Sequence, residues 1–113
     1  LINDPLLPKV ESIAKTAELK KASSIRALRV GHLTAENQFM VIIEGTNNRQ
    51  IQAIADSIED DHIEQYKNKP YIKDGTIASG WIILDYGPIM VHVMTSAMRQ
   101  FYKLEQRWAQ GEV

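Results

Sequence analysis

Apolar residues recur in two segments of the chain with the spacing of one helical face, at positions i, i+3, i+4 and i+7. The two sets are Val10, Ile13, Ala14 and Ala17, and Ile51, Ile54, Ala55 and Ile58. They predict helices over about residues 9–21 and 48–64, the first preceded by an irregular arm over residues 1–8. Asn47 is a suitable N-cap for the second helix, and Gln50 stands where a capping box places its partner.

Apolar runs outside these helices predict the strands of a sheet. The run Phe39–Ile43 is apolar throughout, which is typical of a central strand covered on both faces. Two further runs, 81–84 and 89–94, flank the segment Asp85-Tyr86-Gly87-Pro88. The residues of that segment favour a turn, so the two runs predict a hairpin.

The remaining elements complete one α/β domain. Residues 25–30 predict a strand, and residues 69–72 predict a short strand before a turn at Asp74-Gly75. A last helix is expected over Ser96–Gln110, with its main apolar stripe at Ala97, Phe101, Leu104 and Trp108. The order of elements predicts a single α/β domain over residues 1–113, with a five-stranded mixed sheet and helices mainly on one face.

The composition narrows the classes of function. The chain has no cysteine, which excludes disulfides, thiol catalysis and cysteine zinc sites. Its 13 basic and 14 acidic residues are interspersed, whereas a nucleic-acid binder usually shows a basic excess or stripe. We therefore expect little direct nucleic-acid binding. No apolar run approaches the roughly 18–20 residues of a membrane span, and residues 1–8 lack the pattern of a signal peptide.

Catalytic chemistry is only weakly indicated. Gly45-Thr46 lies between a strand and a helix, as the nucleotide-holding turn of a nucleotidyltransferase does. Such an enzyme also needs paired strand carboxylates for Mg²⁺, and Asp85 is the single strand-borne candidate. The three histidines have no metal-ligand spacing. We expect no catalytic residue, no metal and no cofactor, and Gly45 with Asn47 then simply opens a helix.

Polar groups on the second helix have two interpretations each. Arg49 and Gln50 either cap the helix and pair on its surface, or contact a partner or an anion at the positive helix end. The acidic run Glu59, Asp60 and Asp61 is either a solvated face or a docking patch for a basic partner.

The predicted hairpin carries the most informative pattern, because alternation divides it into two faces. One face is mostly aliphatic and suits a core, with Ile82, Leu84, Tyr86, Ile89, Val91 and Val93. The other is mixed, with Trp81, Ile83, Asp85, Met90, His92 and Met94. Trp and Met are enriched at interfaces, so the mixed face predicts a partner site. Alternatively, the arm or the last helix covers it, and His92 is a half-buried, hydrogen-bonded residue.

Two long motifs stand in order along the chain. The first is Phe39-Met40-Val41-Ile42 followed by GTNNRQIQAIAD at 45–56. The second is WIILDYG at 81–87, then Val91-His92-Val93, RQFYKLE at 99–105 and Trp108. With these motifs the chain resembles the Iojap/RsfS family of ribosomal silencing factors over nearly its whole length. It departs from the family pattern at Gln38, usually Asp, at Asn47, usually Ser, and at Asp74, usually Glu.

The resemblance implies a non-catalytic protein with a fold similar to that of nucleotidyltransferases. It implies a cytoplasmic translation repressor that binds the large ribosomal subunit through ribosomal protein L fourteen and blocks joining of the small subunit. A homodimer in the free state is left open. The alternatives are an organellar factor of large-subunit assembly and, less favoured, a nucleotidyltransferase that uses Gly45, Thr46 and Asp85.

In this interpretation the mixed hairpin face meets the ribosomal protein. Trp81 and Ile83 are the expected anchors, and Asp85 and Asp74 are expected to pair with basic side chains. The full set of expected partner-binding residues is Trp81, Ile83, Asp85, Tyr86, Asp74, Met90, His92, Met94 and Glu105.

Overall fold

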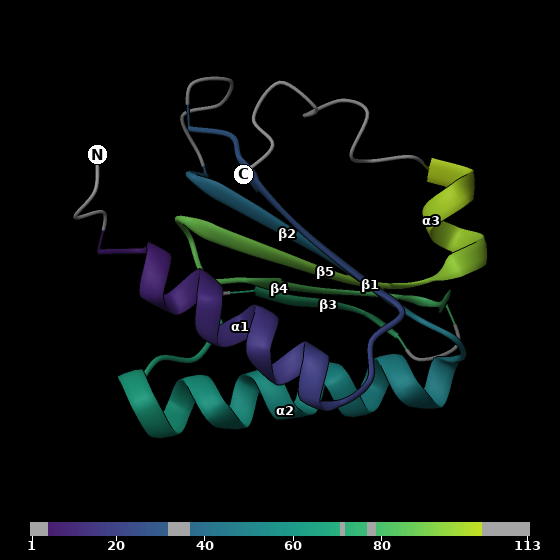
Figure 1. Cartoon of the computed structure of the whole chain (residues 1–113), viewed down its shortest axis with the longest axis horizontal. Coiled ribbons are helices and arrows are strands. Elements are labelled where there is room, and N and C mark those ends of the chain that lie inside the picture. Colours follow the sequence, from purple (N-terminus) through teal and green to yellow (C-terminus); the bar gives the residue numbers. More distant parts are fainter. Residues whose placement is uncertain (1–4, 32–36, 71, 77–78, 103–113) are drawn as a thin grey trace.

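The structure is a computed structural model that describes residues 5–31, 37–70, 72–76 and 79–102 (Figure 1). The bounds of its helices and strands are α1 Leu7–Leu19, β1 Ser24–Arg29, β2 Phe39–Gly45, α2 Asn48–Tyr66, β3 Ile72–Thr76, β4 Trp81–Asp85, β5 Ile89–Thr95 and α3 Ser96–Tyr102.

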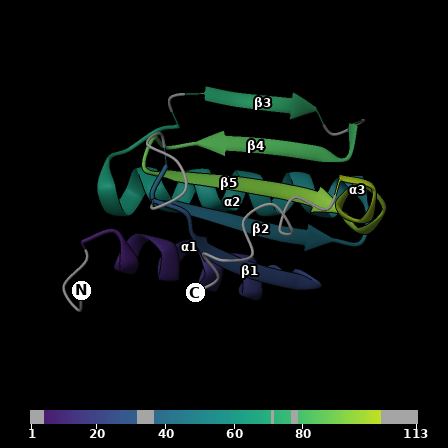
Figure 2. The same cartoon turned by 90° about the horizontal axis from the view of Figure 1, so that it is seen from above.

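The strands form a five-stranded mixed sheet in the order β1-β2-β5-β4-β3. β2 and β5 are parallel, and the other neighbouring pairs are antiparallel. α1 and α2 lie along one face of the sheet, whereas α3 lies at one end of it (Figures 1 and 2). The α/β fold with helices mainly on one face is thus confirmed. The expected likeness to nucleotidyltransferase topology stays a prediction.

The core lies between the sheet and the two long helices. Both predicted helical stripes face it, and their buried members are Val10, Ile13, Ala17, Ile51, Ile54, Ala55 and Ile58. The sheet contributes alternate residues of its inner strands, Val41, Ile43, Ile82, Leu84, Val91 and Val93. This burial specifies the register of the strands, because a slip of one residue would turn each set to the other face.

The start of α2 is capped as Asn47 predicts. Asn47 Oδ1 accepts a hydrogen bond from the backbone N–H of Gln50 at 2.8 Å. The capping box differs from the expected one, because Gln50 Oε1 accepts from the backbone N–H of Thr46 at 2.7 Å rather than from Asn47. The Gln50 amide also donates to the carbonyls of Lys20 and Lys21, which joins the start of α2 to the end of α1.

Replacing Asn47 with alanine is expected to lower the free energy of unfolding by about 1 kcal/mol, because the Gln50 N–H loses its acceptor. Urea denaturation followed by circular dichroism measures this change. Asn48→Ala is the matched control at the next, exposed position, and it should change stability by less than about 0.5 kcal/mol. Equal losses in the two variants would contradict the capping role.

The predicted helix boundaries need correction. α1 begins at Leu7, so Pro8 lies in its first turn instead of in an irregular arm. Proline is tolerated there because N–H groups in the first turn have no acceptor within the helix, so the N–H that proline lacks costs no hydrogen bond. α1 ends before Lys21, which takes a φ of 63°. α2 extends to Tyr66 and ends at Lys67, whose left-handed conformation forms the C-cap.

The third strand was predicted in the wrong place. β3 runs through Asp74-Gly75, where the sequence indicates a turn, and the Cα of Gly75 is paired with that of Ile82. The local preference of Asp-Gly for a turn is overridden by backbone pairing with β4. β3 is an edge strand, where glycine is better tolerated than in a central strand.

The last helix also differs from its predicted stripe. Ala97 is exposed, whereas Arg99 is buried and Met98 is partly buried. The described part of α3 ends at Tyr102, and the predicted continuation with Leu104 and Trp108 lies outside the described residues.

Candidate partner-binding face

The sheet face away from α1 and α2, here called the distal face, carries the mixed side of the hairpin. Its Cα positions pair across the strands in three rows. The first row is Ser24, Glu44, Met94, Trp81 and Thr76; the second is Arg26, Ile42, His92, Ile83 and Asp74; the third is Leu28, Met40, Met90, Asp85 and Ile72. Because the aliphatic side of the hairpin lies in the core between sheet and helices, the predicted division into two faces is confirmed.

Exposure across the distal face is uneven. A buried cluster consists of Leu28, Val30, Met40, Ile42 and Met94, and Trp81 and Met98 pack against it. His92 is 5% exposed. Four residues of β4 and β5 on the distal face are partly exposed and are here called the hairpin patch: Trp81, Ile83, Asp85 and Met90. Among the expected binding residues whose burial the structure describes, these four are the accessible ones.

Trp81 is held by a hydrogen bond to His92. The indole N–H of Trp81 donates to His92 Nδ1 at 3.0 Å, and the ring centroids lie 5.8 Å apart. Indole nitrogen can only donate, so Nδ1 must be the acceptor, and the neutral imidazole carries its proton on Nε2. This bond fixes both the indole orientation and the histidine tautomer.

His92 is an uncharged residue at neutral pH. Burial lowers its pKa to about 4, and the charge of Asp85 opposes this change with a smaller effect. Its Nε2 atom is buried and has no hydrogen-bond partner among the described residues. One interpretation of the sequence was that His92 is half-buried and hydrogen-bonded. His92 is indeed hydrogen-bonded, but it is almost fully buried.

Asp85 has a structural role in the turn between β4 and β5. Its Oδ1 atom accepts a hydrogen bond from the backbone N–H of Gly87 at 2.8 Å. Gly87 has a φ of 87°, a conformation that favours glycine. The Asn37 side chain donates to the Gly87 carbonyl and fastens the turn near the start of β2. A substitution at Asp85 must keep the acceptor oxygen if only the charge is to be tested.

Tyr86 does not belong to the distal face. It is 3% exposed and lies in the core, with its ring centroid 4.5 Å from that of His62. Burial, and then the charge of Glu59, raise the pKa of the Tyr86 phenol. Alternation along the hairpin placed Tyr86 on the aliphatic side, and this agrees with its position in the core. Its inclusion among the expected partner-binding residues does not agree with that burial. Met94, fully buried in the distal cluster, is likewise not accessible here.

Two other expected site residues, Asp74 and Glu105, are described only in part or not at all. Asp74 is in β3, where its Cα is paired with that of Ile83 in the row that includes His92. Glu105 lies outside the described residues.

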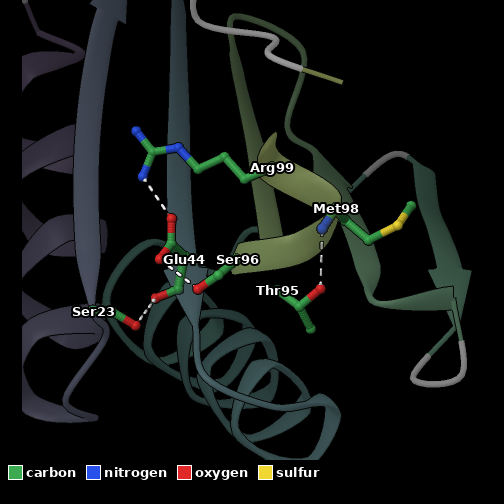
Figure 3. Close-up of polar contacts among 6 residues, drawn as sticks. All are labelled: Ser23, Glu44, Thr95, Ser96, Met98 and Arg99. Atoms are coloured by element: carbon green, nitrogen blue, oxygen red, sulfur yellow. Dashed lines mark hydrogen bonds and ion pairs between the residues drawn. The ribbon is translucent and has the colours of Figure 1, made fainter. Parts of the chain in front are cut away.

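A charged pair at one end of the distal face was not predicted from the sequence. Arg99 of α3 reaches Glu44 at the end of β2, with 3.2 Å between the guanidinium nitrogen and Oε1. The Ser96 hydroxyl donates to the other carboxylate oxygen at 2.6 Å (Figure 3). The one signal in the sequence was a glutamate near the end of an otherwise apolar strand, but its partners are more than 50 residues away.

The residues of the nucleotidyltransferase alternative do not come together. Gly45 is paired with Thr95 at one end of the central strands, whereas Asp85 is paired with Met90 near the other end. Met90 in turn pairs with Met40, five residues before Gly45, which corresponds to roughly 17 Å along β2. A single site cannot use both ends.

The turn at Gly45-Thr46 is also occupied by contacts of its own. The Thr46 N–H and hydroxyl both donate to Gln50 Oε1. A Cβ at Gly45 would lie 2.8 Å from Ile51 Cγ2, so glycine is needed for the close approach of strand and helix. This geometry supports the interpretation of the turn as a helix start.

Other polar groups give no indication of a metal site. Within the ranges that the structure describes, no three His, Cys, Asp or Glu residues could hold a metal ion together. Of the acidic run on α2, Asp61 accepts a hydrogen bond from Ser12 of α1, while Asp60 is exposed. Arg49 is exposed at the start of α2. No helix in the described part is long and apolar enough to cross a membrane.

The structure is thus that of a small α/β protein with a partly exposed, mainly apolar patch on the distal face of its sheet. Residues 4–113 match the family model described as "Ribosomal silencing factor during starvation" (RsfS). The chain belongs to this RsfS family.

Known relatives are similar to this protein over most of its length. Ribosomal silencing factor RsfS of Haemophilus influenzae is 30% identical over 103 residues, with 88% of this chain and 97% of that protein covered. Protein Iojap of the maize (Zea mays) chloroplast is 34% identical over 95 residues, which are 84% of this chain and 41% of the maize protein. The solved structure of protein CV0518 from Chromobacterium violaceum superposes with a TM-score of 0.83 at 27% identity, covering 91% of this chain and 86% of that one.

One further relative has a name that refers to ribosome assembly. The mouse protein named "Mitochondrial assembly of ribosomal large subunit protein 1" is 25% identical over 105 residues, covering 88% of this chain and 44% of the mouse protein.

Proposed function

We propose that this protein binds the large ribosomal subunit through ribosomal protein L fourteen and blocks joining of the small subunit, and so represses translation in the cytoplasm. The observation that supports this most is the hairpin patch. It is a partly exposed apolar surface with one carboxylate, in a chain that belongs to the RsfS family.

The hairpin patch has the composition of a binding surface. Trp81 supplies a large aromatic contact, Ile83 and Met90 extend the apolar area, and Asp85 adds one charge at its edge. Aromatic residues and methionine are enriched at interface cores. The hydrogen bond from Trp81 to His92 orients the indole before any partner arrives, so little side-chain freedom is lost on binding.

The charge of the surface favours a basic protein over RNA as the direct partner. The chain has a formal net charge of −1, and the patch itself contributes the Asp85 carboxylate. A phosphate backbone would be repelled there, whereas a lysine or arginine would be attracted. A mainly apolar interface with few ion pairs also predicts a modest dependence on salt.

The affinity for the large subunit is expected to fall by less than about tenfold between roughly 50 and 200 mM salt. A protein that grips 6–10 phosphates would lose about 10³- to 10⁵-fold over this range. Sedimentation of the protein with isolated large subunits at several salt concentrations gives the slope. A loss of ~10³-fold would indicate that RNA, not a ribosomal protein, supplies the main contact.

Large-subunit assembly is the second candidate function, favoured by the name of the mouse relative. A silencing factor should bind mature large subunits, whereas an assembly factor should bind their precursors and be released from the finished particle. Comparing sedimentation with both kinds of particle separates the two functions. A homodimer that covers the hairpin patch in the free protein is a competing state, and analytical ultracentrifugation measures it.

Blocked subunit joining is the direct test of the proposed function. Separated subunits are mixed with Mg²⁺ in the presence of increasing amounts of the protein, and joined ribosomes are measured by light scattering. We expect joining to decrease as the large subunits become saturated, because the bound protein occupies the face that the small subunit needs. Joining that proceeds unchanged on large subunits saturated with the protein would contradict the proposal.

A further inference from the structure

The end of the distal face that contains Trp81 is also the end that α3 covers. Trp81 of β4, Met94 of β5 and Glu44 of β2 form one row of paired positions across the sheet. α3 follows directly after β5, and its Met98 packs against the same cluster as Trp81. α3 and the aromatic side chain of the hairpin patch thus share one buried cluster, so the position of α3 bears on the packing beneath Trp81.

Glu44 fixes α3 by two contacts on one side of the helix. Its carboxylate accepts from the Ser96 hydroxyl at 2.6 Å and from the Arg99 guanidinium at 3.2 Å. The side chains of Arg99 and Glu44 are 10% and 21% exposed, so water screens this pair only in part. Figure 3 shows Ser96 and Arg99 directed toward Glu44, whereas Met98 leaves the helix on another side.

The other side of α3 reaches the start of β4. Gly80 accepts a hydrogen bond from the Thr95 N–H at 2.9 Å through its carbonyl, and Thr95 Oγ1 accepts from the Met98 N–H at 3.4 Å. A Cβ at Gly80 would lie only 3.1 Å from Met98 Cγ. A displacement of α3 would thus move Met98 relative to the residue immediately before Trp81.

We propose that Glu44 and Arg99 are positioning residues for partner binding: the pair holds α3 so that Met98 and the Gly80 backbone keep Trp81 in its binding orientation. This inference rests on the proposed function, because it assigns the regulation of the same hairpin patch. Neither residue needs to touch the partner. Loss of the pair loosens the end of the distal face that contains Trp81, while the core between sheet and helices, which contains neither residue, is retained.

Tryptophan fluorescence tests the positioning without any ribosome. The chain has two tryptophans, so a Trp108→Phe background leaves Trp81 as the single emitter. In that background Glu44→Gln, which keeps the size of the side chain and removes its charge, should shift Trp81 emission to longer wavelength and increase its quenching by acrylamide. The double variant Glu44→Gln with Arg99→Gln removes both charges and should show the same shift, even if the charge of Arg99 without the Glu44 carboxylate destabilises the single variant.

Ser23→Ala is the matched control. The Ser23 hydroxyl also contacts Glu44, but at its backbone carbonyl, 3.3 Å away, and not at its carboxylate. It should leave Trp81 emission unchanged. If both glutamine variants also leave emission and quenching unchanged, the pair does not position Trp81 and the inference is wrong.

Binding to the large subunit then separates this inference from the proposed function. We expect the double variant to bind about 2- to 30-fold more weakly, the range in which residues outside the contact modulate binding. Wild-type affinity in a variant with shifted emission would overturn the link to binding. Absence of binding by the wild-type protein would refute the proposed function, while the emission shift would still show that the pair positions Trp81.

Discussion

Trp81→Ala is expected to weaken binding to the large ribosomal subunit by about 30- to 1,000-fold, equivalent to roughly 2–4 kcal/mol. The partly exposed indole is the largest side chain of the hairpin patch and is already oriented by His92. A partner that covers it removes its remaining surface from water. Folding stability should fall less, by about 1–3 kcal/mol, mainly because His92 Nδ1 loses its donor inside the protein.

A core variant in the same strand, β4, controls for the effect of lost folding stability on binding. Leu84 is on the same strand, is fully buried and faces the helices. Leu84→Ala should cost about 2–5 kcal/mol of folding stability, yet its folded molecules should bind with wild-type affinity. If Trp81→Ala instead binds normally while Leu84→Ala binds weakly, the surface that meets the partner is not the hairpin patch.

Asp85→Asn tests the charge at the edge of the patch without breaking the turn. Asparagine keeps a side-chain oxygen that can accept from the Gly87 N–H, as Asp85 does at 2.8 Å. A basic partner should then bind more weakly by about 0.2–1 kcal/mol, the usual contribution of an exposed ion pair. Unchanged affinity, with an unchanged thermal midpoint, would place the partner's basic residues elsewhere.

Acid is expected to destabilise the folded protein through His92. Burial lowers the pKa of His92 to about 4 in the folded state, against an ordinary value of 6.5 when the chain is unfolded. Above pH 6.5 neither state takes the proton, and this contribution to stability is fully present. As the pH falls from 6.5 toward 4, the unfolded state gains the proton first, so stability falls. The loss approaches about 3 kcal/mol at pH 4, since each unit of pKa difference is worth about 1.4 kcal/mol.

His92→Gln isolates this effect from other titrating groups. Glutamine does not titrate, and its oxygen can accept from Trp81 in place of Nδ1. Urea denaturation from pH 7 to pH 4.5 should therefore show a smaller loss of stability in His92→Gln than in the wild-type protein. Burial also lowers the pKa of His62, so part of the acid sensitivity should remain in the variant. Parallel stability curves for the two proteins would show that His92 is not the source.

The two faces of the hairpin could be predicted from the sequence because their alternation follows burial directly. Ile82 and Leu84 meet α2 and the core, whereas Trp81 and Ile83 stay partly exposed on the distal face. The start of α2 was equally predictable, since Asn47 acts on the N–H of Gln50, only three residues away. Patterns of this kind are local, and a single sequence contains them.

The features that could not be predicted depend on distant partners. β3 forms through Asp74-Gly75 because β4 pairs with it, although the dipeptide favours a turn. Glu44 and Arg99 lie 55 residues apart and meet only when α3 folds against the end of β2. Alternation placed His92 on the distal face, but it could not show that His92 would be almost fully buried there. The sequence therefore predicted which residues lie on each face of the hairpin better than the contacts that bury or fix them.

Sedimentation with separated ribosomal subunits tests the central claim most directly. The purified protein is centrifuged through sucrose with large subunits, with small subunits and alone, and Trp81→Ala is run beside it. We expect the wild-type protein to pellet with large subunits, to remain largely unbound with small subunits, and to lose the first interaction in the Trp81 variant. Equal sedimentation with both subunits, or with neither, would contradict the account.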